Sequence, residues 1–312
     1  MRRAIVAALG LVAMIACLAA FWGVEIDRRP APPNLGPGAG VVSVEFLDVG
    51  QGDAILIRSP EGKTALIDAG PSNRVVDLLR ERGVRSLDLV AVSHHHQDHY
   101  GGMAAVIRAF RPRAFLDADS LHVTANYVAL LKVVKAEKMM AIRAGPEPRK
   151  IDLGSVRLTT LPLGPLDEKN ENNNSIGLLV EYGGFSALLT GDSEGPERRW
   201  WSRHAARLCA DVDVLKLAHH GSHNGTDARW LALTSPRLAV ASLGASNLFG
   251  HPARSTLALV GKAKIPLLRT DQDGSIRVQS DGRTFSISTP ARASRRTGGR
   301  APTRQGGGRG VK

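Results

Sequence analysis

Short apolar runs alternate with amphipathic segments along the chain from Val41 to Ser288. Apolar runs bounded by turn residues are typical of strands, and apolar residues at helical spacing are typical of helices. Because hairpins such as the one at Gly183-Gly184 mix with strand-helix units, we expect an α/β (α+β) domain of two packed sheets with helices outside. The predicted strands are Val42–Leu47, Ala54–Arg58, Thr64–Ile67, Leu87–Val92, Val156–Leu163, Ile176–Tyr182, Ser186–Thr190 and Val212–Leu217, and the predicted helices are Arg74–Arg82, Gly102–Phe110, Val123–Lys138, Pro196–Leu208 and Ala253–Lys262.

The N-terminus carries a long apolar segment. Arg2 and Arg3 precede an uncharged run from Ala4 to Val24, which as a helix is long enough to cross the hydrocarbon layer of a bilayer. We therefore expect residues 1–27 to be an uncleaved membrane anchor, with a cleaved signal segment as the main alternative. Acylation at Cys17 is a third option, which the apolar residues after Cys17 disfavour. In each case the positive flank stays inside, so the protein is expected at the extracytoplasmic face of the cell membrane or secreted.

Two polar segments flank the expected domain at 41–288. Residues 28–40 are rich in Pro and Gly and predict a linker. Residues 289–312 contain seven basic residues, no acidic residue and almost no apolar residue, which predicts a disordered tail. Most of the net charge of +12 lies in this tail and at Arg2 and Arg3, so the domain itself is only mildly basic. The tail is expected to be either an arm that binds DNA or a solvated end.

A dense histidine cluster follows the predicted strand Leu87–Val92. The cluster contains the pattern HxHxDH, formed by His94, His96, Asp98 and His99. In an extended segment residues two apart point the same way, so His94 and His96 can present nitrogens to one metal. Asp98 and His99 begin the turn into the next helix and can serve a second metal. A chance cluster or a solvated loop is the alternative, and this ligand spacing directly after a strand argues against it.

Six motifs in the same order give the chain a family resemblance. Together with HxHxDH they resemble the metallo-β-lactamase superfamily, and in particular the extracytoplasmic hydrolase domain of ComEC-type competence proteins. The resemblance covers about Val41 to Val278 and implies a four-layer αββα sandwich. The motifs are Phe46-Leu47-Asp48-Val49-Gly50-Gln51-Gly52-Asp53, Leu66-Ile67-Asp68-Ala69-Gly70, Leu189-Thr190-Gly191-Asp192, His219-His220-Gly221-Ser222, Gly250-His251-Pro252 and Arg269-Thr270-Asp271-Gln272-Asp273-Gly274.

The resemblance implies two divalent metal ions, zinc or manganese. His219 would face the substrate, and Asp68 would accept a proton from a ligand imidazole and so fix its tautomer. Turn or helix-cap roles remain the alternative for Asp68 and Asp192, and Asp48 and Asp53 are expected to shape a loop. The implied ligands are His94 and His96 for the first metal, Asp98, His99 and His220 for the second, and Asp192 for both through its two carboxylate oxygens.

One position departs from the superfamily pattern. Most members supply a third histidine to the first metal from a segment before the bridging aspartate. The chain has Asn170–Ser175 there, and His122 comes too early in the sequence, at an expected helix start. ComEC-type domains also have Asn-Ser at this place, so we expect a weaker first site or one completed by water.

Three functions are compatible with these residues. The favoured one is a phosphodiesterase or nuclease that acts on DNA outside the cytoplasmic membrane through a water activated by two metals. Asp98, His219 and His251 are the expected catalytic residues, and backbone amides near Gly221 and Ser222 are expected to hold phosphate oxygens. The alternatives are a hydrolase of envelope or small-molecule esters and a catalytically weak, membrane-tethered binding module.

The DNA hypothesis also implies partners. ComEC-type proteins have a many-helix channel that has no counterpart in this sequence, so either a separate protein supplies the channel or this domain has been reused for another purpose; DNA and a separate channel protein are the possible partners. The oligomeric state cannot be derived from these patterns.

Overall fold

A computed structural model describes residues 40–118, 120 and 122–290. The expected anchor or signal at 1–27, nearly all of the linker at 28–40 and nearly all of the tail at 289–312 lie outside these residues. Within the described part of the chain, no helix combines the length and the apolarity needed to cross a membrane.

The first sheet has eight strands, in the order β15-β14-β1-β2-β3-β4-β5-β6. Pairing is antiparallel from β15 to β3 and parallel from β3 to β6. The strands are β1 (Val42–Phe46), β2 (Ile55–Arg58), β3 (Thr64–Ile67), β4 (Leu89–Ala91), β5 (Ala114–Asp117), β6 (Met140–Arg143), β14 (Ile276–Ser280) and β15 (Phe285–Ser288).

The second sheet has seven strands, in the order β13-β12-β11-β10-β9-β8-β7. Strands β10 to β13 are parallel, and β10, β9, β8 and β7 pair antiparallel. The strands are β7 (Lys150–Leu153), β8 (Val156–Thr160), β9 (Leu178–Tyr182), β10 (Phe185–Leu189), β11 (Val214–Lys216), β12 (Leu238–Ala241) and β13 (Leu267–Arg269).

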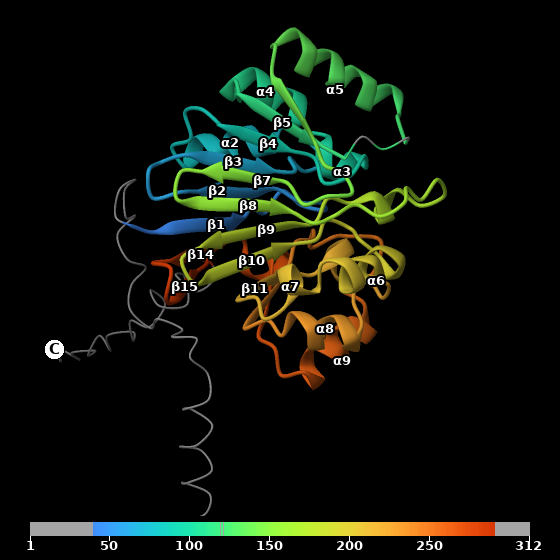
Figure 1. Cartoon of the computed structure of the whole chain (residues 1–312). Coiled ribbons are helices and arrows are strands. Elements are labelled where there is room, and N and C mark those ends of the chain that lie inside the picture. Colours follow the sequence, from blue (N-terminus) through green and yellow to red (C-terminus); the bar gives the residue numbers. More distant parts are fainter. Residues whose placement is uncertain (1–39, 119, 121, 291–312) are drawn as a thin grey trace, which may run out of the picture.

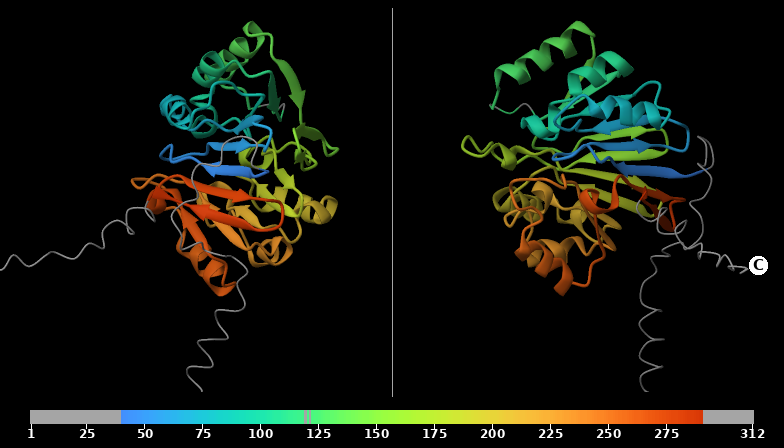
Figure 2. Two further views of the ribbon diagram at one scale, coloured as in Figure 1. Left: turned by 90° about the vertical axis from the view of Figure 1, so that its left-hand side faces the viewer. Right: turned by 180° about the vertical axis from the view of Figure 1, so that it is seen from behind.

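Helices cover the outer face of each sheet (Figures 1 and 2). Against the first sheet pack α2 (Arg74–Glu81), α4 (Met103–Phe110) and α5 (Ala125–Ala136), and against the second α6 (Gly195–His204), α7 (Ala206–Cys209), α8 (Ala228–Thr234) and α9 (Arg254–Lys262). Short helical turns complete the set: α3 (Gln97–Tyr100), η1 (Glu171–Asn174), η2 (Ala218–Gly221) and α10 (Thr270–Asp273).

The core consists of three apolar layers, one between the sheets and one under each group of helices. Alternation along the strands produces this arrangement. Ile55 and Ile57 of β2 face the other sheet, whereas Leu56 between them packs with the helices. The expected four-layer αββα sandwich is confirmed.

The sequence pattern missed three strands. Between the predicted helices Gly102–Phe110 and Val123–Lys138 the chain forms β5, and β6 and β7 follow before Val156. Strands β6 and β7 are the edges of their sheets and are largely exposed, so their side chains do not give the apolar run of a buried strand. The predicted helix Pro196–Leu208 is interrupted at Ala205, where α6 ends and α7 begins.

Parallel pairing brings the polar motifs to one edge of the sandwich. Strands β3 and β4 are parallel neighbours in the first sheet, and β10 and β11 are parallel neighbours in the second. Asp68 follows β3, His94 follows β4, Asp192 follows β10 and His220 follows β11. The carboxyl ends of these strands therefore place both motif groups in facing loops.

Candidate metal centre

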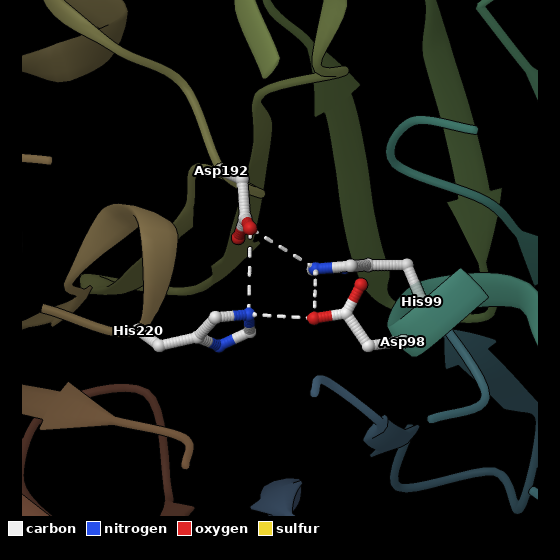
Figure 3. A group of neighbouring side chains, drawn as sticks. All are labelled: Asp98, His99, Asp192 and His220. Atoms are coloured by element: carbon white, nitrogen blue, oxygen red, sulfur yellow. Dashed lines mark hydrogen bonds and ion pairs between the residues drawn. The ribbon is translucent and has the colours of Figure 1, made fainter. Parts of the chain in front are cut away.

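Four side chains from three loops meet at this edge (Figure 3). Nε2 of His220 lies 3.2 Å from Oδ2 of Asp98 and 3.3 Å from Oδ2 of Asp192. Nε2 of His99 lies 3.3 Å from the same Asp192 oxygen and 4.0 Å from Oδ2 of Asp98. One ligand atom from each residue lies within 4.8 Å of the others, and imidazole nitrogens and carboxylate oxygens are the donors that divalent transition metals prefer.

The two histidines of this cluster are oriented by outer partners. Nδ1 of His99 lies 2.8 Å from Oδ2 of Asp68, and Nδ1 of His220 lies 2.9 Å from the carbonyl oxygen of Ser242. Both oxygens accept a hydrogen bond from Nδ1, which leaves each Nε2 facing the centre. Nε2 of His99 is buried without a hydrogen-bond partner, as expected for an atom that ligates a cation.

Asp68 is anchored for this role. Its carboxylate accepts hydrogen bonds from the backbone nitrogen of Ser93 at 2.7 Å and from the hydroxyl of Ser93 at 2.8 Å. These bonds fix both oxygens of a fully buried side chain next to His99. The side chain therefore does more than form a turn.

His94 and His96 lie beside the cluster. Nε2 of His94 is 3.0 Å from Nδ1 of His96 and 4.0 Å from Oδ2 of Asp192. The segment Asn170–Ser175, which lacks the superfamily's third histidine, contains η1. There Nδ2 of Asn172 donates to Glu194 at 3.0 Å, and His122 lies near Asp167, so neither side chain joins His94 and His96.

Charge is unevenly shared among the imidazoles. Burial opposes protonation of His99, but Asp192 and Asp68 outweigh it and raise its pKa well above the usual value. The pKa of His220 rises to about 9, because Asp192 again outweighs burial. Burial, with His99 nearby, lowers the pKa of His94 well below its usual value. The carboxylates that stabilise these imidazolium ions also favour a bound divalent cation. Binding of the cation would displace the imidazolium protons of His99 and His220.

A buried ion pair lies behind the cluster, and the sequence analysis missed it. Nζ of Lys216 is 2.6 Å from Oδ2 of Asp53, and both side chains are fully buried. The ammonium group also donates to the carbonyl oxygen of Gly191 at 3.0 Å and lies 3.8 Å from Oδ1 of Asp192. Asp53 therefore has a charge partner and does not merely shape its loop. Lysine in an apolar strand gives no such signal until its partner is known.

The two oxygens of Asp192 have different surroundings. Oδ2 lies within 4.0 Å of Nε2 of His94, His99, His219 and His220. Oδ1 faces the ammonium group of Lys216. In this arrangement the histidines converge on Oδ2, and the bridging of two metals by the two carboxylate oxygens of Asp192 stays a prediction.

His219 and His251 lie at the open side of the cluster. Nδ1 of His219 is 3.3 Å from Oε1 of Glu194, and its Nε2 is 4.0 Å from Oδ2 of Asp192. The rings of His219 and His251 are 5.5 Å apart. Burial, followed by the charges of His219 and His220, lowers the pKa of His251 to about 4. His251 is therefore neutral near pH 7.

Three neighbouring groups belong elsewhere. The side chain of His95 points away from the cluster, lies 2.8 Å from Asp117 and stacks on Tyr127, as alternation in an extended segment requires. Asp48 accepts from the backbone nitrogen of Gly50 and shapes its loop as expected. The backbone nitrogen of Ser222 donates to His219 at 2.8 Å, so the expectation that it holds a phosphate oxygen is wrong.

Sequence relatives of this chain include proteins named for competence. ComE operon protein 3 of Bacillus subtilis is 26% identical over 269 residues, which cover 79% of this chain and 34% of that protein. Competence protein ComA of Neisseria gonorrhoeae is 30% identical over 246 residues, covering 75% of this chain and 32% of that protein. The chain thus spans about a third of the length of these relatives.

A solved structure and a family model agree with the fold. CmlA, a diiron beta-hydroxylase from Streptomyces venezuelae, matches with a TM-score of 0.50 and 17% identity, covering 77% of this chain and 53% of that one. The family model described as "Metallo-beta-lactamase superfamily" matches residues 47–245, which include all the clustered histidines and aspartates described above except His251. This chain belongs to the metallo-β-lactamase superfamily, whose fold implies binding of divalent metal.

Proposed function

We propose that this chain is a metal-dependent phosphodiesterase that hydrolyses DNA with a water activated between two divalent cations, zinc or manganese. The observation that carries the proposal is the cluster of Asp98, His99, Asp192 and His220, whose ligand atoms all lie within 4.8 Å of one another and include the buried, unpartnered Nε2 of His99. The relatedness to proteins named for competence points to DNA among the substrates that such a centre can hydrolyse.

The residues suit two cation sites of unequal strength. His94 and His96 would hold the first cation, Asp98, His99 and His220 the second, and Asp192 both. When bound, two such cations lower the pKa of a shared water and stabilise charge on a phosphoryl oxygen. Asp68 and the Ser242 carbonyl keep the ligand imidazoles in the required tautomer.

Three side chains would act on the substrate and the water. Asp98 is partly exposed at the cluster and would accept a proton from the attacking water. His219, oriented by Glu194, would donate a hydrogen bond to a phosphoryl oxygen. His251, beside His219 and neutral near pH 7, would donate a hydrogen bond to the phosphate, since a group with a pKa of about 4 holds no acidic proton to give at that pH. The proposal depends on the cluster, and these three roles follow from it.

The place of action is part of the proposal. An N-terminal anchor or signal at 1–27 would put the enzyme at the extracytoplasmic face of the membrane, where incoming DNA is accessible. A channel protein is a possible partner in this proposal. An envelope or small-molecule ester hydrolase and a weak binding module are the competing functions.

The test uses the full chain reconstituted with Mn²⁺ or Zn²⁺. Single-stranded DNA, duplex DNA and bis(p-nitrophenyl) phosphate are offered in parallel, and we expect metal-dependent cleavage of DNA. Cleavage of the small ester alone supports the envelope or small-molecule hydrolase, and absence of any cleavage by metal-loaded protein supports the binding module.

Replacement of the shared carboxylate tests the centre itself. Asp192→Asn should lower metal affinity by at least about 100-fold and remove activity, because the amide cannot balance the cations. The fold should persist, since Asp192 lies in a loop at a strand end. Asp152→Asn, on the exposed edge strand β7, is the matched control. Retention of both metals by Asp192→Asn in elemental analysis contradicts the assignment.

A further inference from the structure

The loop between β12 and α9 carries two exposed apolar side chains. Leu248 is 97% exposed and Phe249 is 69% exposed, which makes them the two most exposed large apolar residues in the described part of the chain. The same connection begins with Ser242, whose carbonyl oxygen orients His220. The exposed pair therefore belongs to the rim of the metal centre.

A series of rings connects Phe249 to the cluster. The ring of Phe249 stacks on that of His251, with 5.7 Å between centroids and 25° between planes. The ring of His251 lies 5.5 Å from that of His219 and 6.4 Å from that of His220. Aromatic faces thus extend from the solvent to a proposed metal ligand.

The loop holds this position through Asn247. Its Oδ1 accepts from the backbone nitrogen of His251 at 2.9 Å, and its Nδ2 donates to the carbonyl oxygens of His251 and Gly244 at 3.0 Å each. At the base of the loop, the backbone nitrogen of Gly244 donates to Oε1 of Gln51 at 3.3 Å. These hydrogen bonds therefore hold the loop that carries Phe249 beside the metal centre.

We propose that Phe249, flanked by Leu248, is a subsite on which a nucleobase of the substrate strand stacks. This inference rests on the proposed DNA phosphodiesterase function. A base one or two nucleotides from the cleaved phosphodiester would lie on the exposed face of the ring, while the phosphate is held near His251 and His219. Stacking does not distinguish bases strongly, because every base has an aromatic face.

The subsite selects single-stranded DNA. In a duplex each base is already stacked on its neighbours and paired, so placing one on Phe249 requires unstacking. In a single strand the bases are available. A lipid bilayer is the other partner that an exposed Leu-Phe pair suggests, but two side chains bury little apolar area, whereas one ring suffices to hold one base.

The experiment compares an oligonucleotide with the same oligonucleotide carrying abasic positions around the cleavage site. Metal-loaded full chain, Phe249→Ala and Phe249→Trp are assayed for kcat/KM on both. We expect the wild type to prefer the base-containing strand by about 5- to 100-fold, which corresponds to the usual strength of one base-aromatic stack. In Phe249→Ala this ratio should fall toward one, mainly through KM, and Phe249→Trp should retain it.

Controls separate the possible failures. Met140→Ala removes a 62% exposed apolar side chain from the edge strand β6, and it should keep the wild-type ratio. If wild type cleaves no oligonucleotide while it binds metal, the proposed function fails. If wild type cleaves DNA but the ratio is the same in Phe249→Ala, only the stacking subsite is wrong. Loss of binding to phosphatidylglycerol vesicles by Phe249→Ala, with unchanged DNA kinetics, assigns the pair to the membrane and overturns the inference.

Discussion

The ammonium group of Lys216 connects three loops that carry proposed ligands or their supports. It pairs with Asp53, donates to Gly191 directly before Asp192, and donates to the carbonyl oxygen of Leu217 at 3.2 Å. Burial opposes the charge on Lys216, but Asp53 and Asp192 outweigh it and raise the pKa of the ammonium group. Lys216 is therefore a charged positioning residue beneath the centre.

Removing one partner of this pair leaves an isolated buried charge. Lys216→Met should destabilise the fold by about 3–5 kcal/mol and weaken metal binding, whereas combining it with Asp53→Asn should restore part of the stability. Urea unfolding and metal titration measure the two effects. Lys63→Met breaks the half-exposed pair with Asp88 and should cost no more than about 1 kcal/mol. A loss in Lys216→Met no larger than in Lys63→Met would show that the buried pair does not organise the centre.

Among single residues, the sequence predicted the proposed metal ligands better than the residues that hold those ligands in place. The ligand pattern at His94 to His99 is local, so its spacing alone indicates a metal site. Asp53 and Lys216 are far apart in the chain, and each is individually ordinary for a turn or a strand. Only the fold brings them together. The Glu194–His219 contact was missed for the same reason.

Among the elements, helix α6 places the ionisable carboxyl group of Glu197 in the interior. The side chain of Glu197 is only 3% exposed, and neither of its oxygens has a hydrogen-bond partner. Burial raises the pKa of this carboxyl well above its usual value. The next residue, Arg198, donates to the carbonyl oxygens of Ser193 and Asn224 and so ties α6 to two loops near the centre.

The buried carboxyl makes stability depend on pH. Above about pH 4.3 the unfolded chain releases the proton of Glu197 while the native protein keeps it, so the free energy of unfolding falls as pH rises toward the native pKa. The loss is about 1.4 kcal/mol per pH unit in that window. Glu197→Gln should thus be more stable than wild type by at least about 1 kcal/mol at pH 8 and nearly equal to it at pH 4.5.

Urea unfolding at both pH values measures this difference. Glu147→Gln, at an exposed position, should leave the pH dependence unchanged. Equal stability of Glu197→Gln and wild type at pH 8 contradicts a protonated native Glu197.

Element prediction succeeded where a short, fully buried run follows a turn. The range Thr64–Ile67 was predicted with the observed bounds, because all four side chains are buried and a turn precedes them. Helix α5 was predicted two residues too long at each end; at its start the prediction passed over the N-cap Thr124, whose side chain accepts a hydrogen bond from the backbone nitrogen of Tyr127. The edge strands β6 and β7 carry side chains that are exposed or only partly buried at most positions, so their pairing depends on neighbours that a local pattern does not reveal.

The charge of the whole molecule is concentrated in its C-terminal tail. If residues 289–312 form an arm that binds DNA, their seven basic residues should raise affinity without reading sequence, through release of counterions. Deleting them should weaken DNA binding mainly at low salt and reduce the slope of log K against log salt by up to about 6.

Fluorescence anisotropy of a labelled duplex over a range of salt concentrations measures the slope. Hydrolysis of a small uncharged ester serves as the control and should not change, because the metal centre is intact. Coincident slopes for the truncated and the full chain would leave the tail with a solubilising role only.

The donor atoms come from both halves of the sandwich, with His94, His96, Asp98 and His99 after β4 of one sheet and Asp192 and His220 after strands of the other. The distances between the two groups are therefore set by how the sheets dock, through apolar side chains such as Val44 and Leu158 that never approach the centre. Selection on metal affinity thus acts on the shape of the inter-sheet core as well as on the ligands. A core substitution that the fold tolerates can still lower the metal affinity. If the sheets slide past one another by about an ångström, donors that must bind the same ions move apart.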